Sequence, residues 1–75
     1  MSLNPQSEER ARLAALPILD FPNDVAILTN VPGSTLEKLH SEGRGPRTFK
    51  IGRRRKTTPE FVRKWRDEMA EAEAA

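Results

Sequence analysis

The sequence of 75 residues predicts one small, mostly α-helical domain that carries a single two-stranded β-hairpin. Three observations lead to this fold class. Apolar residues recur at helical spacing behind helix-start signals in 24–29, 34–41 and 59–72. A glycine, Gly52, separates two short segments that can pair as strands, because glycine readily turns the chain back on itself. An additional helical segment, 7–16, precedes these elements and ends before a proline.

Composition excludes several kinds of site. The chain has no cysteine, which rules out a disulfide framework, a zinc-thiolate centre and a thiol nucleophile. Its only histidine is His40, so we expect no histidine-based metal site and no cofactor. No apolar run approaches the roughly 18 residues of a membrane-spanning helix, and no hydrophobic signal segment follows the first residue. We therefore expect a cytoplasmic protein that does not contact a membrane.

The N-terminal extension, 1–17, is expected to hold a short helix. Ser7 can cap this helix and two glutamates suit its first turn. Leu13 and Leu16 form a short apolar face, but the sequence leaves open whether the helix packs on the rest of the chain. The main domain is expected to span 18–70, followed by an acidic tail, 71–75, that frays.

The segment between Pro17 and Pro22 is apolar and extended, and we expect Ile18 and Phe21 to contribute to the core. The next helix opens near Asp24, and Asn30 can end it in the left-handed conformation. Pro32, near the first helical position, indicates the start of another helix. Gly43 closes the following helix. Residues 24–43 thus have the spacing of a helix-turn-helix, whose second helix would enter a major groove of DNA.

The second of these helices separates its side chains into two sets. Leu36 and Leu39 face inward, while polar side chains face outward and are candidates for DNA contact. These candidates are Ser34, Thr35, Glu37, Lys38 and His40. His40 and Glu37 are one turn apart on an exposed face, which favours a surface pair over a catalytic dyad, so we do not expect an enzyme.

A basic hairpin follows the helix-turn-helix. Thr48 to Ile51 and Arg54 to Thr57 are the expected strands, with Phe49 and Ile51 on one face. Between residues 44 and 56 the chain has seven basic residues and no acid: Arg44, Arg47, Lys50, Arg53, Arg54, Arg55 and Lys56. Burying so much charge would be prohibitively costly, so these cations must face water or a polyanion such as the DNA backbone.

The charge is also segregated along the chain. Residues 1–43 carry three basic residues and six acids, residues 44–66 carry ten basic residues and one acid, and residues 67–75 carry four acids. A basic block between acidic flanks indicates a localised binding surface.

The last helix starts at Thr58 and Pro59, a cap followed by a proline at the first helical position. Its broad apolar face includes Trp65, which we expect to pack beneath the hairpin. The predicted core is Val25, Leu28, Val31, Leu36, Leu39, Phe49, Ile51, Phe61, Val62 and Trp65.

Three runs of the sequence resemble one family. They are Asp24-Val25-Ala26 with Ser34-Thr35-Leu36, the run Lys50-Ile51-Gly52-Arg53-Arg54-Arg55, and Pro59 with Val62 and Trp65. Together they resemble the small winged-helix proteins of the excisionase and AlpA type, relatives of the MerR DNA-binding domain, over about residues 18–68. The resemblance implies a winged helix-turn-helix fold, to which the N-terminal helical segment 7–16 is an addition that the family does not place. It also implies duplex DNA binding, with the recognition helix in the major groove and the wing on the backbone or minor groove.

The chain departs from the family at its recognition helix. Pro32-Gly33 stands where family members usually have a Ser-Arg pair, and Glu37-Lys38 stands where an aromatic and a basic residue are usual. Asn30 replaces the glycine that usually ends the first helix.

These observations and the resemblance together predict a sequence-selective double-stranded DNA-binding protein, an excisionase of a phage or integrated element. The resemblance also implies a nucleoid-associated protein of a bacterial or phage-infected cell. The expected partners are duplex DNA, an integrase, and further copies of the chain bound cooperatively on DNA. Two alternatives remain open: an AlpA-like transcriptional regulator, and an adaptor whose basic hairpin binds an acidic protein. Single-stranded RNA is disfavoured, because all four aromatic residues (21, 49, 61 and 65) are expected at core positions.

Overall fold

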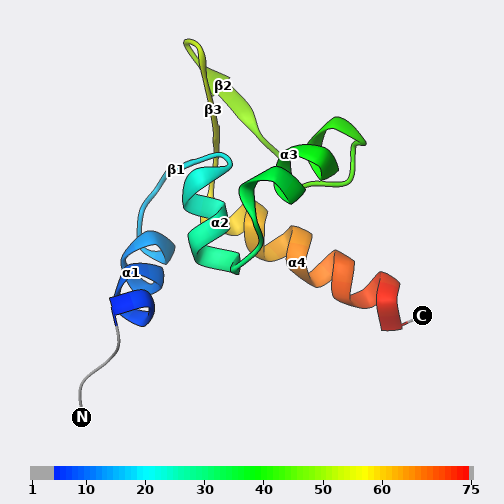
Figure 1. Ribbon diagram of the computed structural model, residues 1–75, viewed down its shortest axis with the longest axis horizontal. Helices are drawn as coiled ribbons and strands as arrows, with labels where there is room; N and C mark the ends of the chain where they lie inside the picture. The colour runs from blue at the N-terminus through cyan, green and yellow to red at the C-terminus, as the bar shows by residue number, and fades with distance from the viewer. Residues whose placement is uncertain (1–4, 75) are drawn as a thin grey trace.

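The computed structural model describes residues 5–74, which form four helices and a three-stranded antiparallel sheet (Figure 1). In chain order the elements are α1 (Pro5–Ala14), β1 (Leu19–Asp20), α2 (Asn23–Thr29), α3 (Gly33–Ser41), β2 (Phe49–Ile51), β3 (Arg54–Thr57) and α4 (Pro59–Ala74). The prediction of a small, mostly helical domain is confirmed. The arrangement is compatible with a helix-turn-helix followed by a wing.

The sheet has one strand more than the predicted hairpin. β3 lies in the middle, with β2 on one side and β1 on the other. Leu19 pairs with Thr57 and Asp20 with Lys56. The Phe21 amide extends this edge by donating to the Arg55 carbonyl over 3.1 Å. The extended segment before α2 is thus not a linker but the strand that joins the hairpin to the helical body.

Helix α1 belongs to the same core as the other helices. Leu13 is 1% exposed and packs with Leu19, Phe21, Val25, Leu36 and Val62. The Arg10 Nε donates to the Ile27 carbonyl over 3.3 Å and links α1 to α2. The helix begins at Pro5, two residues before the predicted cap, so Ser7 lies in its first turn. Residues 1–4 of the predicted extension lie outside the described residues.

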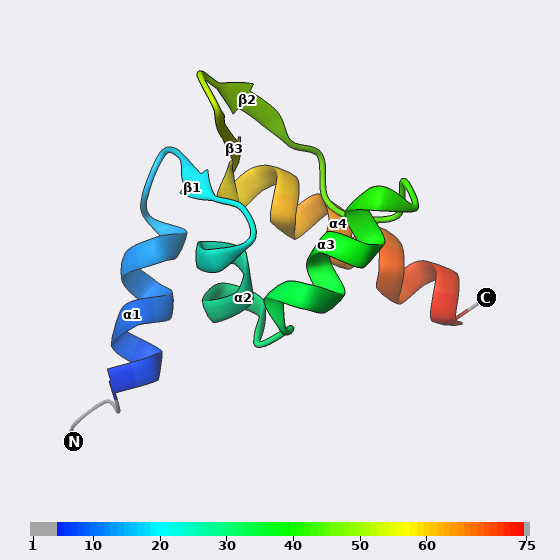
Figure 2. The same cartoon turned by 45° about the horizontal axis from the view of Figure 1, so that its top comes forward.

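Two residues predicted in the core are exposed. Ile18 is 41% exposed, because its neighbour Leu19 is the residue that points into the body. Ile51 is 52% exposed, because it lies near the tip of a hairpin that projects from the helices (Figure 2).

The sheet register explains why Ile51 is exposed. Residues directly opposite each other share a face, and successive residues alternate between faces. Phe49 pairs with Lys56, whereas the fully buried Thr57 is the next residue along β3. Phe49 and Ile51 therefore lie on the face opposite the one that Leu19 and Thr57 turn toward the core.

The remaining predicted core positions separate into buried and half-buried ones. Val25, Leu36 and Val62 are buried as expected. The others are half-buried: Leu28, Val31 and Trp65, which pack against the buried cluster, and Leu39, Phe49 and Phe61.

The predicted chain reversals are present. Asn30 ends α2 with a φ of 59°, and Gly52 turns the hairpin with a φ of 63°. Residues other than glycine and asparagine rarely adopt this conformation, which is why these positions were readable from the sequence.

Helix α4 is longer than predicted. It continues to Ala74, so residues 71–74 of the expected frayed tail are helical, and residue 75 lies outside the described residues. Its second half extends away from the other elements in both views (Figures 1 and 2). None of the helices described over residues 5–74 is long and apolar enough to cross a membrane.

Candidate nucleic-acid interface

Helix α3 exposes the polar side chains of its first turns. Ser34, Thr35, Glu37 and Lys38 are exposed, whereas Leu36 between them is completely buried. No side chain of the described residues caps the start of the helix, and its first internal bond runs from the Leu36 amide to the Pro32 carbonyl over 3.1 Å. The earlier amides of the helix thus point out of its N-terminus, where an anion is favoured.

His40 differs from the other predicted contacts of α3. Its side chain is half-buried, and its ring centroid lies 5.6 Å from that of Phe21, with the ring planes tilted by 57°. The expectation of a fully exposed His40 is wrong, because the last turn of α3 packs on the segment before α2. No ion pair joins His40 to Glu37 among the described residues.

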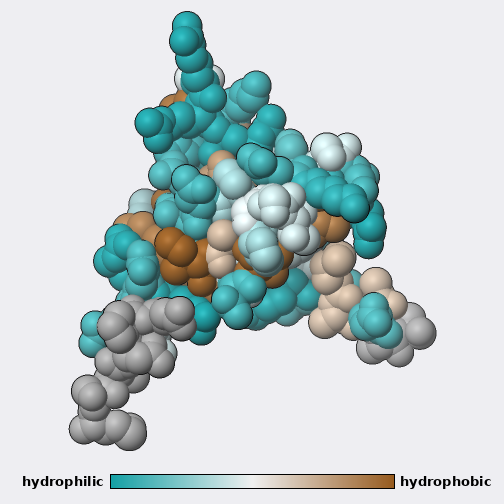
Figure 3. Space-filling model, viewed as in Figure 1, coloured by the Kyte–Doolittle hydropathy of each residue, from teal (hydrophilic) through white to brown (hydrophobic). Residues whose placement is uncertain are grey.

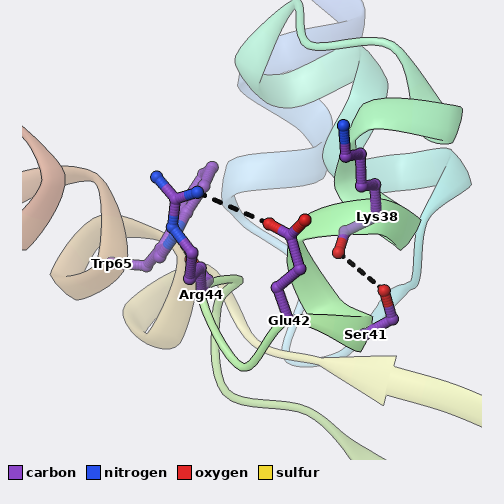
Figure 4. A network of polar contacts seen from close by, with 5 residues as sticks. All are labelled: Lys38, Ser41, Glu42, Arg44 and Trp65. Carbon is purple, nitrogen blue, oxygen red and sulfur yellow. Dashed lines mark hydrogen bonds and ion pairs between the residues drawn. The ribbon is translucent and has the colours of Figure 1, made fainter.

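One hydrogen bond fastens the loop after α3 to α4, and two further polar contacts lie within the end of α3 and this loop (Figure 4). The Trp65 indole Nε1 donates to the Arg44 carbonyl over 2.8 Å, and the Arg44 guanidinium lies 3.4 Å from the Glu42 carboxylate. The Ser41 hydroxyl donates to the Lys38 carbonyl over 2.8 Å at the end of the helix. Trp65 therefore positions the loop that leads from α3 to the hairpin, in addition to packing against the core.

Arg47 is held against an aromatic ring. Its guanidinium carbon lies 5.3 Å from the centre of the Phe61 ring, a cation–π distance, and its side chain remains exposed. Its carbonyl accepts a hydrogen bond from the buried Thr57 hydroxyl over 2.7 Å. Arg47 is thus a cation of restricted position at the foot of the hairpin.

Two of the hairpin cations are bound within the protein. The Arg55 Nη1 donates to the Thr48 hydroxyl over 3.0 Å. The Lys56 ammonium donates to the Asp20 carboxylate of β1 in a half-buried ion pair. That hydrogen bond lowers the pKa of Asp20 below its usual value of 3.8, against the opposing effect of partial burial, and the positive charges of Lys56 and Arg54 act in the same direction as the bond.

The other three hairpin cations are Lys50, Arg53 and Arg54. All three are exposed, and none forms an ion pair or side-chain hydrogen bond with any residue in 5–74. Lys50 lies opposite Arg55 on one face, Arg54 lies opposite Ile51 on the other, and Arg53 follows Gly52 in the turn. The projecting hairpin therefore offers positive charge on both faces and at its tip, within the hydrophilic surface at the top of Figure 3.

Sequence reasoning missed two residues that position these cations. Asp20 binds Lys56 from 36 residues away, and Thr57 is a fully buried hydroxyl that ties β3 to the loop before β2. Neither carries a local signal, because each acts through a partner that only the fold brings near. The aromatic residues also differ from expectation, since Phe49, Phe61 and Trp65 are half-buried and only Phe21 is buried.

The described residues contain no group of three or more His, Cys, Asp or Glu side chains that could hold a metal ion. Comparisons of the chain with protein-family models, with curated proteins and with solved structures found no match.

Proposed function

We propose that this chain is a sequence-selective double-stranded DNA-binding protein with a winged helix-turn-helix fold. In this proposal α3 enters the major groove and the hairpin is the wing, which contacts the neighbouring backbone or minor groove. The observation that carries the proposal is the exposure of Lys50, Arg53 and Arg54 on a projecting hairpin, where none of the three forms an ion pair with the described part of the chain. Phosphates supply the countercharge that the protein itself does not.

Features of α3 support a second contact surface. Its uncapped N-terminus and the exposed hydroxyls of Ser34 and Thr35 suit a backbone phosphate. Lys38 and Glu37 can reach base edges, a lysine to guanine and a glutamate to the amino group of cytosine. Since the half-buried His40 packs on Phe21, base reading falls mainly to these two residues.

For the biological role we propose an excisionase of a phage or integrated element that acts with an integrase. The resemblance of the Lys50–Arg55 run and of Trp65 to that group supports this role. An AlpA-like regulator would use the same surface, and only the flanking DNA site would distinguish the two.

The test is a fluorescence-anisotropy titration of a labelled random duplex of about 20 base pairs at several salt concentrations from 50 to 200 mM. Three to five phosphate contacts give a log–log slope of about −3 to −5. A single strand of the same length should bind more weakly. The absence of duplex binding at 50 mM salt would refute the proposal and favour the adaptor that binds an acidic protein.

A further inference from the structure

A groove of about 500 Å³ runs along α4 on a part of the molecule that the proposed DNA contacts do not use. Its apolar wall is formed by Ala14, Leu28, Val31, Leu39, Val62 and Met69. Arg63 and Arg66 form its charged rim. None of the exposed polar residues of α3 and none of the hairpin residues lines this groove.

The residues that α4 contributes to the groove lie on one helical face that continues past the groove. They are Pro59, Val62, Arg63, Trp65, Arg66 and Met69, which cover one broad side of the helix. The next positions on the same face are Ala70 and Glu73, which are exposed on the half of the helix that extends beyond the body (Figure 1). A single surface thus passes from the groove to the free end of the helix.

This face changes the sign of its charge along its length. Arg63 and Arg66 lie at the groove, and Glu73 lies at the free end. Within residues 5–74 Arg66 has only the adjacent Asp67 as an ion-pair partner, at 3.7 Å, and both side chains are about two-thirds exposed. Such an exposed pair contributes little to stability, so Arg66 remains available for another carboxylate.

A second copy of the same face is complementary to the first when the two helices run antiparallel. In the register that places Arg66 opposite Glu73 of the other copy, Met69 lies opposite Ala70 of that copy. The long, flexible side chain of Met69, which is 37% exposed, then contacts the small Ala70 of the other copy. Each contact occurs twice because the arrangement has twofold symmetry. The end of each helix also reaches toward the other copy's groove.

We propose that two copies of this chain associate through this face of α4, with paired antiparallel helices. The charge pattern favours a second copy as the occupant, because one helix supplies both the basic half and its acidic complement. The contact between the two helices is short, so the dissociation constant is expected to be on the order of 10⁻⁴ M. The association is independent of the proposed DNA binding and is measured without DNA.

The test is sedimentation equilibrium between about 20 µM and 1 mM protein in low salt. The average mass should rise from 8.5 kDa toward twice that value. Arg66→Glu and Glu73→Arg should each weaken association at least about tenfold by placing like charges opposite each other. An equimolar mixture of the two variants should associate again, because each then offers the charge that the other needs.

The control is the pair Lys64→Glu and Glu71→Arg, which makes the same charge changes on the opposite face of α4. These variants should associate like the parent protein. The proposal is overturned if the parent stays at 8.5 kDa up to 1 mM, if the control variants lose association equally, or if mixing Arg66→Glu with Glu73→Arg restores nothing. All four positions are exposed, so circular dichroism should show unchanged folding.

Discussion

Replacing Lys50, Arg53 and Arg54 together by alanine should remove most of the affinity for duplex DNA without unfolding the hairpin. The three side chains are exposed and make no ion pair or side-chain hydrogen bond with the described residues. The contacts that hold the hairpin, from Lys56 to Asp20 and from Thr57 to the loop, remain in place. The triple variant therefore tests the free cations of the wing apart from its fold.

The magnitude follows from the release of counterions. Each phosphate contact contributes about −0.9 to the slope of log affinity against log salt concentration, so three lost contacts should flatten the slope by about 2.7. Each phosphate contact makes the affinity for DNA about eightfold higher at 0.1 M salt than at 1 M salt, and three contacts make it about 500-fold higher. The loss should be similar for every duplex sequence, because phosphates carry no sequence information.

The assay is the anisotropy titration described above, carried out on the parent, the triple variant and a control. The control replaces Arg12, Arg63 and Lys64 by alanine, which removes three exposed charges from α1 and α4. It should bind with the parent's slope. An unchanged slope in the hairpin variant, or an equal change in the control, would refute the assignment of the hairpin as the DNA-contacting wing.

Three further changes test other parts of the structure. Leu13→Ala should lower the free energy of unfolding by about 3 kcal/mol in a denaturant titration, because Leu13 is buried in the shared core; a change near zero would mean that α1 is not part of it. Asp20→Asn should cost less than about 1 kcal/mol at pH 7, since the Asp20 side chain is partly exposed. Because Lys56 lowers the pKa of Asp20 in the folded protein, the ion pair contributes its full stability at pH values well above 3.8, the usual pKa of this carboxyl group. This contribution is lost as the pH falls through the lower pKa of the folded protein. Thermal melts of the parent and the variant should therefore converge in acid, and a constant difference would contradict the ion pair. Glu37→Gln should raise the affinity for random duplex about fivefold, because it removes the repulsion between the Glu37 carboxylate and a phosphate, which is roughly 1 kcal/mol for two charges about 4 Å apart in water. An unchanged affinity would mean that α3 lies away from the phosphates.

The elements that the sequence predicted well depend on local chemistry. Asn30 and Gly52 take the left-handed conformation that few other residues adopt, so their residue types predicted the end of α2 and the hairpin turn. The third strand has no such signal, because Leu19 and Asp20 become a strand only by pairing with residues far along the chain. The inward face of the hairpin was likewise decided by Leu19 and Thr57, and not by the apolar residues Phe49 and Ile51.

The candidate site was predictable as a set of cations but not as individual roles. Charge segregation alone identified the basic hairpin. It could not distinguish Lys56, whose partner Asp20 lies 36 residues away, from Lys50, which has no such partner in residues 5–74. Helical spacing likewise placed His40 with the exposed residues of α3, although the aromatic ring of Phe21 packs on it from a distant segment.

The proposed DNA binding requires a hairpin that is ordered before it meets DNA, and the division between bound and free cations meets this requirement. Two strands of three and four residues are marginal in isolation, and ordering them on DNA would reduce the affinity. Lys56 joins the hairpin to β1 through Asp20, and Arg55 braces β3 against Thr48, so the hairpin is ordered before it meets a ligand. The charges nearest the helical body thus hold the scaffold. In the proposed function the charges at the tip contact phosphate, so a loss of Asp20 should weaken DNA binding although Asp20 itself is an acid.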